Sequence, residues 1–323
     1  MNADILEDDI QRLAPELLET LLRDHTTQRN IFWATSDYEP LGGGYGYDDE
    51  ILPELITGGH GQVVKPRILK TREQQTDRSK DMAEVFTPSW VCNAQNNLVD
   101  EAWFGRKDVF NVEDSANHTW RAHPENITFP EGKTWKDYVH ATRLEITCGE
   151  APYLVSRYDA TTGNPIPLSE RIGLLDRKLR VISENVDVSG EWLKWAQLAY
   201  MNTYGYEWQG DNLLLAREAL LWTFIEYYQA KFGKMPLLKS INYIAYIISW
   251  NLWQMDGLKG VVPNSCRHAV TVTEQTLFGE EKKMLNCPGC LQNDIHQHNG
   301  TYCLIRDWPN GKKKIRFIDL LKS

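Results

Sequence analysis

The chain has 323 residues, 42% of them hydrophobic and 11% aromatic, a composition typical of a packed globular protein and not of a disordered one. A formal net charge of −9 argues against a stand-alone DNA clamp, because neutralisation of phosphates dominates affinity for duplex DNA. The sequence has no apolar run long enough to span a membrane and an acidic N-terminus unlike a signal peptide, so we expect a cytoplasmic protein whose six cysteines favour metal over disulfides.

Residues 1–82 predict an N-terminal helical and basic region. Isoleucines and leucines recur at helical spacing over residues 1–30, and Pro15 within this pattern predicts a break into two helices. A glycine-rich loop follows at 42–47. Lysines and arginines gather in 60–82, which fits either a solvated connector or an arm that contacts phosphates.

Residues 83–265 alternate between helical and strand patterns and predict an α/β domain. We expect a helix that begins near Pro88, a strand at 142–148, helices within 169–200 and a second strand at 203–208. Asp211 is a candidate N-cap for a long helix that ends near Lys231. Residues 241–254 predict a helix that runs into a strand, and 266–323 form a third region, a Cys/His-rich segment with a C-terminal strand.

Two of the predicted strands end in an acid. Glu145 closes the first and is followed by a turn at Gly149, where the absence of a side chain lets the backbone approach a ligand. Glu207 closes the second, where a carboxylate can accept hydrogen bonds from both ribose hydroxyls of a nucleoside cofactor. Since ligands of open α/β sheets bind beyond the carboxyl ends of strands, we expect one nucleoside-containing ligand across both acids. An ordinary strand-helix turn and a surface glutamate are the alternatives.

Four short motifs follow one another along the chain, and their order is more informative than any one of them alone. They are Phe86-Thr87-Pro88; Glu145 with Cys148, Gly149, Tyr153 and Leu154; Glu207-Trp208; and Asp256. On these motifs, residues 84–258 resemble the adenine-N6 DNA methyltransferases of restriction-modification systems, with Ala151 where that family usually has a second glycine. The resemblance implies a Rossmann-like methyltransferase fold that binds S-adenosylmethionine. The first two motifs would hold its methionine end, Glu207 the ribose and Asp256 the adenine amino group.

The catalytic motif of that family, Asn-Pro-Pro-Tyr, is not found in this sequence. The nearest string, Asn164-Pro165-Ile166-Pro167, lacks the aromatic ring that stacks on a flipped base and fits a polar turn better. The resemblance therefore implies a cofactor-binding subunit that needs a second protein for the catalytic loop and for recognition of the DNA target. A non-catalytic scaffold or sensor of S-adenosylmethionine in a restriction complex is the alternative, and a nuclease subunit is the weakest candidate.

A zinc site is expected in the Cys/His-rich region. Cys287-Pro288-Gly289-Cys290 places two thiolates at the spacing of a zinc knuckle. Cys266 is the expected third ligand, and the fourth is expected to be His296, with His298 and Cys303 as open alternatives. Such a site with four protein ligands would be structural. Free thiols or a redox-active pair are the alternatives.

Overall fold

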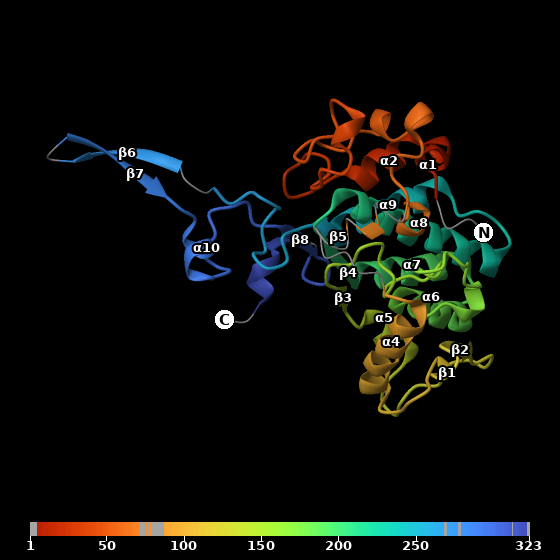
Figure 1. Ribbon diagram of the computed structural model, residues 1–323. Helices are drawn as coiled ribbons and strands as arrows, with labels where there is room; N and C mark the ends of the chain where they lie inside the picture. Colours follow the sequence, from red (N-terminus) through yellow and green to blue (C-terminus); the bar gives the residue numbers. More distant parts are fainter. Residues whose placement is uncertain are drawn as a thin grey trace.

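A parallel sheet of three short strands organises the fold (Figure 1). β3 (Arg143–Glu145), β4 (Thr203–Glu207) and β5 (Leu252–Gln254) lie in that order, with Glu145 opposite Gly205 and Glu207 opposite Gln254. The computed structural model describes residues 5–71, 75–76, 78, 87–267, 270–276, 279–311 and 313–321. The expected α/β class is confirmed.

Pairs of helices make the crossovers that parallel strands require. α6 (Leu174–Asn185) and α7 (Ser189–Met201) connect β3 to β4, and α8 (Gly210–Phe232) and α9 (Leu238–Asn251) connect β4 to β5. α8 is buried along most of its length because its residues are apolar on nearly every side. These elements confirm the helices and strands that the sequence predicts between 142 and 254.

The N-terminal region shares its core with the sheet. α1 (Glu7–Leu13) and α2 (Pro15–Leu22) confirm the predicted break, since Pro15 is the first residue of α2. α2 packs against α8 and α9, and Leu17 and Leu21 belong to the same hydrophobic core as Phe224 of α8. One continuous core therefore joins α2 to the helices around the sheet.

Shorter elements surround this core. α4 (Ser89–Phe104) begins directly after Pro88, as predicted, and is followed by the antiparallel pair β1 (Asn111–Asp114) and β2 (Thr119–Ala122) and by α5 (Trp135–His140). The 3-10 helices are η1 (Glu39–Leu41), η2 (Pro53–Leu55), η3 (Gly58–His60), η4 (Arg67–Leu69), η5 (Leu168–Glu170) and η6 (Phe317–Leu320).

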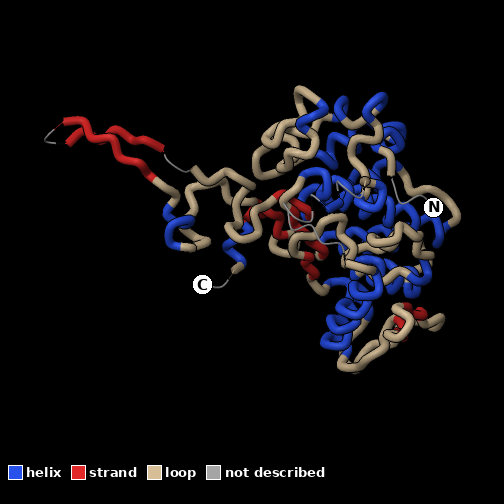
Figure 2. Tube along the Cα trace, in the orientation of Figure 1, coloured by secondary structure: helices blue, strands red, loops and turns tan. Residues whose placement is uncertain are grey.

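The C-terminal region forms a lobe beside the sheet domain (Figures 1 and 2). It is joined to the sheet by a small hydrophobic cluster in which Ile305 and Phe317 pack with Tyr206 and Trp253. β6 (Val270–Thr276) and β7 (Gly279–Leu285) pair as an antiparallel hairpin that projects away from the rest of the chain, and α10 (Pro288–Gln292) follows it. β8 (Leu304–Asp307) and β9 (Lys313–Arg316) form a second hairpin, which confirms the predicted C-terminal strand. Within the described ranges, every helix is too short or too polar to cross a membrane.

Asp211 ties the N-terminal region to the start of α8. The N-cap of α8 is Gln209, so the prediction of Asp211 as N-cap is wrong. The Asp211 carboxylate is buried in the first turn, where Oδ2 accepts hydrogen bonds from Lys70 Nζ at 3.0 Å, Arg78 at 2.8 Å and the Tyr38 hydroxyl at 2.7 Å. Burial alone would raise the pKa of Asp211, but the two cations outweigh it and hold the pKa far below its ordinary value. Two basic residues of the 60–82 segment, Lys70 and Arg78, thus pair with a buried carboxylate of the protein itself.

We expect Asp211→Asn to lower the free energy of unfolding by about 3–5 kcal/mol, because it leaves two buried cations without their shared carboxylate. The matched control is Asp187→Asn. Asp187 also pairs with a lysine, Lys231, at 2.7 Å, but the Asp187 side chain is 93% exposed. That change should cost less than about 1 kcal/mol. Urea unfolding at neutral pH measures both, and equal effects would contradict the buried network.

Candidate cofactor and metal sites

Three acids lie at the carboxyl ends of the three parallel strands. Glu145 is the last residue of β3, Glu207 is the last residue of β4, and Asp256 lies two residues beyond β5. Because parallel strands end at the same edge of a sheet, all three belong to the edge at which α/β folds bind ligands. The tertiary structure thus brings together the acids from three of the sequence motifs.

The loop after β3 has an unusual backbone. Thr147, Gly149 and Ala151 have φ angles of 45°, 52° and 60°, so every second residue is left-handed. This conformation costs a residue other than glycine about 1–3 kcal/mol and is concentrated at ligand sites. The N–H groups of Cys148, Gly149 and Ala151 donate to the Tyr206 carbonyl, Glu207 Oε2 and the Cys148 carbonyl, which holds the loop in this conformation. The loop therefore has the backbone strain expected of a binding loop.

Both glutamates are turned toward this loop. Glu145 accepts hydrogen bonds from the backbone N–H groups of Tyr153 at 3.3 Å and Leu154 at 3.1 Å. Glu207 Oε2 accepts the N–H of Gly149 at 2.8 Å. Each glutamate is only 8% exposed. The two acids therefore share one loop, and Glu145 closes it from its far end.

Burial sets the charge state of the pair. It raises the pKa of Glu145 well above its ordinary value, and the negative charge of Glu207 raises it further, against the two N–H donors. Burial also raises the pKa of Glu207, while the N–H of Gly149 works in the opposite direction. A ligand that offers hydroxyl donors would relieve this cost, because hydrogen bonds to a carboxylate favour its charged form.

Asp256 is held in the turn that follows β5. Its carboxylate accepts the N–H of Leu258 at 3.0 Å and pairs with Lys259 Nζ at 3.1 Å, and the side chain is almost completely buried. A carboxylate offers about four acceptor positions, so these two contacts leave capacity for one further donor. The expected hydrogen bond from an adenine amino group is compatible with this arrangement.

The first sequence motif meets the loop at Tyr153. Pro88 is the N-cap of α4, and the side chain of Thr87 is in hydrogen-bond contact with the Tyr153 hydroxyl. Asn96 of α4 also donates to the Tyr153 carbonyl at 3.0 Å. Phe86 lies outside the described residues. Thr87, just before α4, and Asn96 within α4 therefore both lie next to Tyr153 of the loop.

Trp208 and Cys148 have structural partners. The indole N–H of Trp208, which is half-buried, donates to the Tyr47 hydroxyl at 3.0 Å. The Cys148 backbone N–H donates to the Tyr206 carbonyl at 2.8 Å, which fixes the loop to β4. The Cys148 thiol is buried, and burial raises its pKa well above the ordinary value, so this sulfur is a packing group and not a nucleophile.

The structure adds contacts that the sequence did not indicate. Glu150, next to Gly149, accepts the backbone N–H of Arg67 at 2.7 Å and the Tyr158 hydroxyl at 2.5 Å. Arg67 therefore contacts the loop, whereas Lys70 and Arg78 contact Asp211, which lies beyond β4. The sequence showed a basic segment at 60–82 and an acid at Asp211, but no local pattern indicated that the two would pair.

Asn164-Pro165 lies in a polar turn, as expected. The carboxylate of Asp159 accepts the N–H groups of Thr161 and Thr162 at 2.9 and 2.8 Å, and the Asp159 N–H donates to the Asn164 carbonyl. Asn164 and Pro165 are both exposed. A turn held by an aspartate in this way explains the string without any catalytic role.

A second candidate site lies in the C-terminal lobe. Cys266, Cys287, Cys290 and His298, which we call the metal cluster, offer ligand atoms that all lie within 4.8 Å of one another. The structure corrects the choice of histidine, since His298 Nδ1 meets the three sulfurs and His296 is exposed. The two histidines differ in their backbone contacts: the N–H of His298 donates to the Tyr302 hydroxyl at 2.8 Å, whereas the N–H of His296 donates to the Asp294 carboxylate at 2.9 Å, at an exposed position. This group can hold a metal ion.

The thiols of the metal cluster differ in environment. Burial raises the pKa of Cys266 to about 12. Burial works in the same direction on Cys287, but hydrogen bonds outweigh it, the N–H of Asn299 at 3.3 Å first among them, and lower the pKa to about 6. Cys303, the other cysteine of this region, is buried and donates to the Gln254 carbonyl, away from the cluster.

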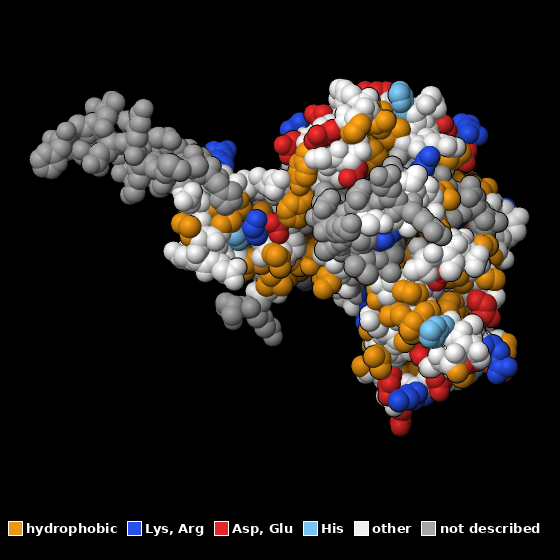
Figure 3. Space-filling view, viewed as in Figure 1, with side chains coloured by type: hydrophobic (Ala, Val, Ile, Leu, Met, Phe, Trp, Pro, Cys, Tyr) orange, Lys and Arg blue, Asp and Glu red, His pale blue; other side chains and the backbone are white. Residues whose placement is uncertain are grey.

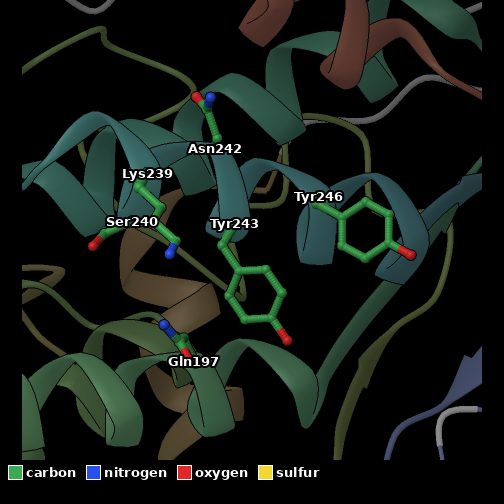
Figure 4. Close-up of a pocket in the computed structure, with 6 residues that line it drawn as sticks. All are labelled: Gln197, Lys239, Ser240, Asn242, Tyr243 and Tyr246. Atoms are coloured by element: carbon green, nitrogen blue, oxygen red, sulfur yellow. The ribbon is translucent and has the colours of Figure 1, made fainter.

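A surface hollow of about 410 Å³ lies apart from both candidate sites (Figure 4). It is formed by α7 and α9, and the tyrosine rings and the lysine drawn there come from the outer side of α9. Its lining is Gln197, Lys239, Ser240, Asn242, Tyr243 and Tyr246. No acid of the sheet edge contributes to it, so the hollow is separate from the cofactor site that the sequence predicts.

Comparison with known proteins gives no match. No protein-family model matches the chain, and neither a curated protein nor a solved structure is detectably similar to it. A functional conclusion must therefore come from the geometry of the sites and from the sequence motifs.

The pH dependence of a Glu145→Gln variant tests the buried acid. Because the pKa of Glu145 is raised in the folded state, wild-type stability falls as pH rises above the ordinary value of about 4.5. Glutamine keeps an acceptor for the loop and carries no charge. We therefore expect the variant to gain stability relative to the wild type between pH 4.5 and 7. Urea midpoints at several pH values measure this, and a constant difference would contradict the assignment.

Proposed function

We propose that this chain is the S-adenosylmethionine-binding subunit, or part, of an adenine-N6 DNA methyltransferase of a restriction-modification system. The observation that carries the proposal is the pair Glu145 and Glu207, which end adjacent parallel strands and hold the same left-handed loop. A nucleoside cofactor that lies across two strand ends needs this arrangement.

Each part of the edge has a role in this proposal. Glu207 would exchange the N–H of Gly149 for the two ribose hydroxyls, which are charge-assisted hydrogen bonds. Asp256 would accept the adenine amino group. The loop after β3, with Tyr153 and the Thr87-Pro88 step, would enclose the methionine end. Bound S-adenosylmethionine supplies an activated methyl group, and these residues position it.

The catalytic loop is missing from this arrangement, and we assign it to a second protein subunit. The sequence has no Asn-Pro-Pro-Tyr motif. In the residues that the structure describes, β3 pairs with β4 only, so its other edge has no strand. Leu144 and Ile146 on this strand and just after it are 43% and 63% exposed. An additional strand from a partner would have a place to join the sheet here.

DNA contact is proposed to depend on the same partner. The net charge is −9, and on the face shown in Figure 3 acidic and basic side chains are intermixed over the described residues. Lys70 and Arg78 form buried ion pairs with Asp211 and do not face solvent. Since phosphate contacts supply most of the affinity for DNA, the complex and not this chain would grip the duplex.

The second candidate function is a non-catalytic scaffold or sensor of S-adenosylmethionine in a restriction complex. The absence of the catalytic motif from the sequence favours it, and the cofactor geometry is common to both candidates. Zinc has a structural role at the metal cluster in either case.

Titration calorimetry with S-adenosylmethionine tests the cofactor site. We expect the chain to bind, and Glu207→Ala to weaken binding by about 10- to 100-fold, as the loss of charge-assisted hydrogen bonds implies. Glu191→Ala, at an exposed position of α7, is the matched control and should bind as the wild type does. Unchanged binding by Glu207→Ala would remove the cofactor assignment.

Methyl transfer separates the two candidate functions. Transfer of labelled methyl groups to DNA should be absent or very low for the chain alone. Proteins that co-purify with it from its native operon should restore adenine methylation if the chain is an enzyme subunit. Binding of the cofactor without methylation by the purified complex would favour the sensor.

A further inference from the structure

The metal cluster has a geometry that hydrogen bonds do not explain. His298 Nδ1 lies 3.5 Å from Cys266 Sγ, 3.4 Å from Cys287 Sγ and 3.5 Å from Cys290 Sγ. One imidazole nitrogen carries either one hydrogen or one lone pair, so it can make one such bond and not three. Three sulfurs at equal distance from one nitrogen indicate a common centre between them.

The distances fit a tetrahedral ion. With Zn–S bonds of about 2.3 Å and a Zn–N bond of about 2.0 Å, a tetrahedral site places each sulfur about 3.5 Å from the nitrogen. The observed distances are 3.4 and 3.5 Å. Three thiolates and an imidazole are soft and borderline ligands, which select zinc over magnesium or calcium.

We propose that Cys266, Cys287, Cys290 and His298 bind one Zn²⁺ ion in a closed structural site that fastens the β6–β7 hairpin to the turn after β5. Four protein ligands complete the tetrahedron and leave no position for water or substrate. On binding, each protonated thiol releases its proton to solvent as its sulfur bonds the metal, with no change of oxidation state.

The glycines around the site support this assignment. Gly289 lies between the two cysteines of the knuckle, and a side chain there would come within 2.7 Å of His298 Nδ1 and of the His298 backbone nitrogen. A side chain on Gly300 would come within 3.1 Å of Cys266 Sγ and 2.7 Å of Ser265 Oγ. Glycine fits at both positions because the ligand residues approach the backbone too closely for a side chain.

The partners around the ligands are also those of a metal site. The N–H of Asn299 donates to Cys287 Sγ at 3.3 Å, and the N–H of His298 donates to the Tyr302 hydroxyl at 2.8 Å. Hydrogen bonds of this kind orient ligands and are a regular feature of zinc sites.

The ion would join three segments that are separated in the sequence. Cys266 precedes β6 and Cys287 follows β7, so the metal closes the base of the projecting hairpin (Figure 1). Val261 packs with Cys266 and Cys287, and its backbone bridges both Asp256 and Tyr302. The metal cluster therefore lies directly behind the turn that holds Asp256. The effect on cofactor affinity that follows rests on the proposed function, but the zinc site itself does not.

Metal analysis and X-ray absorption of the full chain test the site. We expect about one zinc per chain and a first shell of three sulfurs at about 2.3 Å and one nitrogen at about 2.0 Å. A folded protein without metal, an iron-loaded protein, or a disulfide between Cys287 and Cys290 would overturn the proposal.

Substitution of the two histidines gives a matched comparison. His298→Ala should lose most of the zinc, and His296→Ala, two residues away and exposed, should retain it. If His298→Ala does not fold, His298→Cys keeps four ligands and should still bind one zinc. Equal loss in the His296 and His298 variants would contradict the ligand set.

A third measurement separates this inference from the proposed function. Glu207→Ala should keep its full zinc content, whatever it does to cofactor binding. Removal of zinc with a chelator should weaken binding of S-adenosylmethionine several-fold through the Asp256 turn. Unchanged cofactor affinity in the zinc-free chain would remove this coupling and leave the metal site intact, whereas failure of the wild type to bind cofactor would count against the proposed function alone.

Discussion

Parallel pairing of β3, β4 and β5 is the constraint on which the rest of the structure depends. Each parallel pair requires a crossover that returns the chain to the starting edge, and here each crossover consists of two helices. The second of these crossovers carries α8, which is buried because it lies between the sheet, α6, α9 and the N-terminal helix α2. The same pairing places the carboxyl ends of the three strands at one edge, which Glu145, Glu207 and Asp256 share.

Buried charge connects the N-terminal region to this edge. Asp211, four residues after Glu207, pairs with Lys70 and Arg78, and Glu150 of the binding loop accepts the N–H of Arg67. Breaking such pairs is costly because each member would be left charged and without a partner in a medium of low dielectric constant. Arg67, Lys70 and Arg78 are therefore held against both sides of the candidate cofactor site.

The two candidate sites meet at one turn. Asp256 belongs to the cofactor edge, and Val261, five residues later, packs on the cysteines of the metal cluster. A site that needs a fixed carboxylate gains from a rigid support, and a metal ion is a compact way to supply one where the apolar core is small. The hydrophobic cluster next to the metal cluster is small: it contains Val261, Cys266 and Cys287, with Cys290 and Tyr302 packed against it.

The sequence by itself determined the local elements and the kinds of chemistry. Helical spacing, the break at Pro15 and the helix start at Pro88 depend on neighbouring residues, and the structure confirms them. The knuckle Cys287-Pro288-Gly289-Cys290 also depends on spacing alone. Only the tertiary structure decided which strands are adjacent, that His298 and not His296 faces the sulfurs, and that Asp211 binds cations and does not cap a helix. The strand order and the contacts of Asp211 depend on residues far apart in the sequence, such as Lys70 and Asp211, which are 141 positions apart. The choice of histidine depends both on Cys266, 32 positions from His298, and on nearby residues such as Tyr302. A local pattern carries no information about which distant partner a side chain will meet.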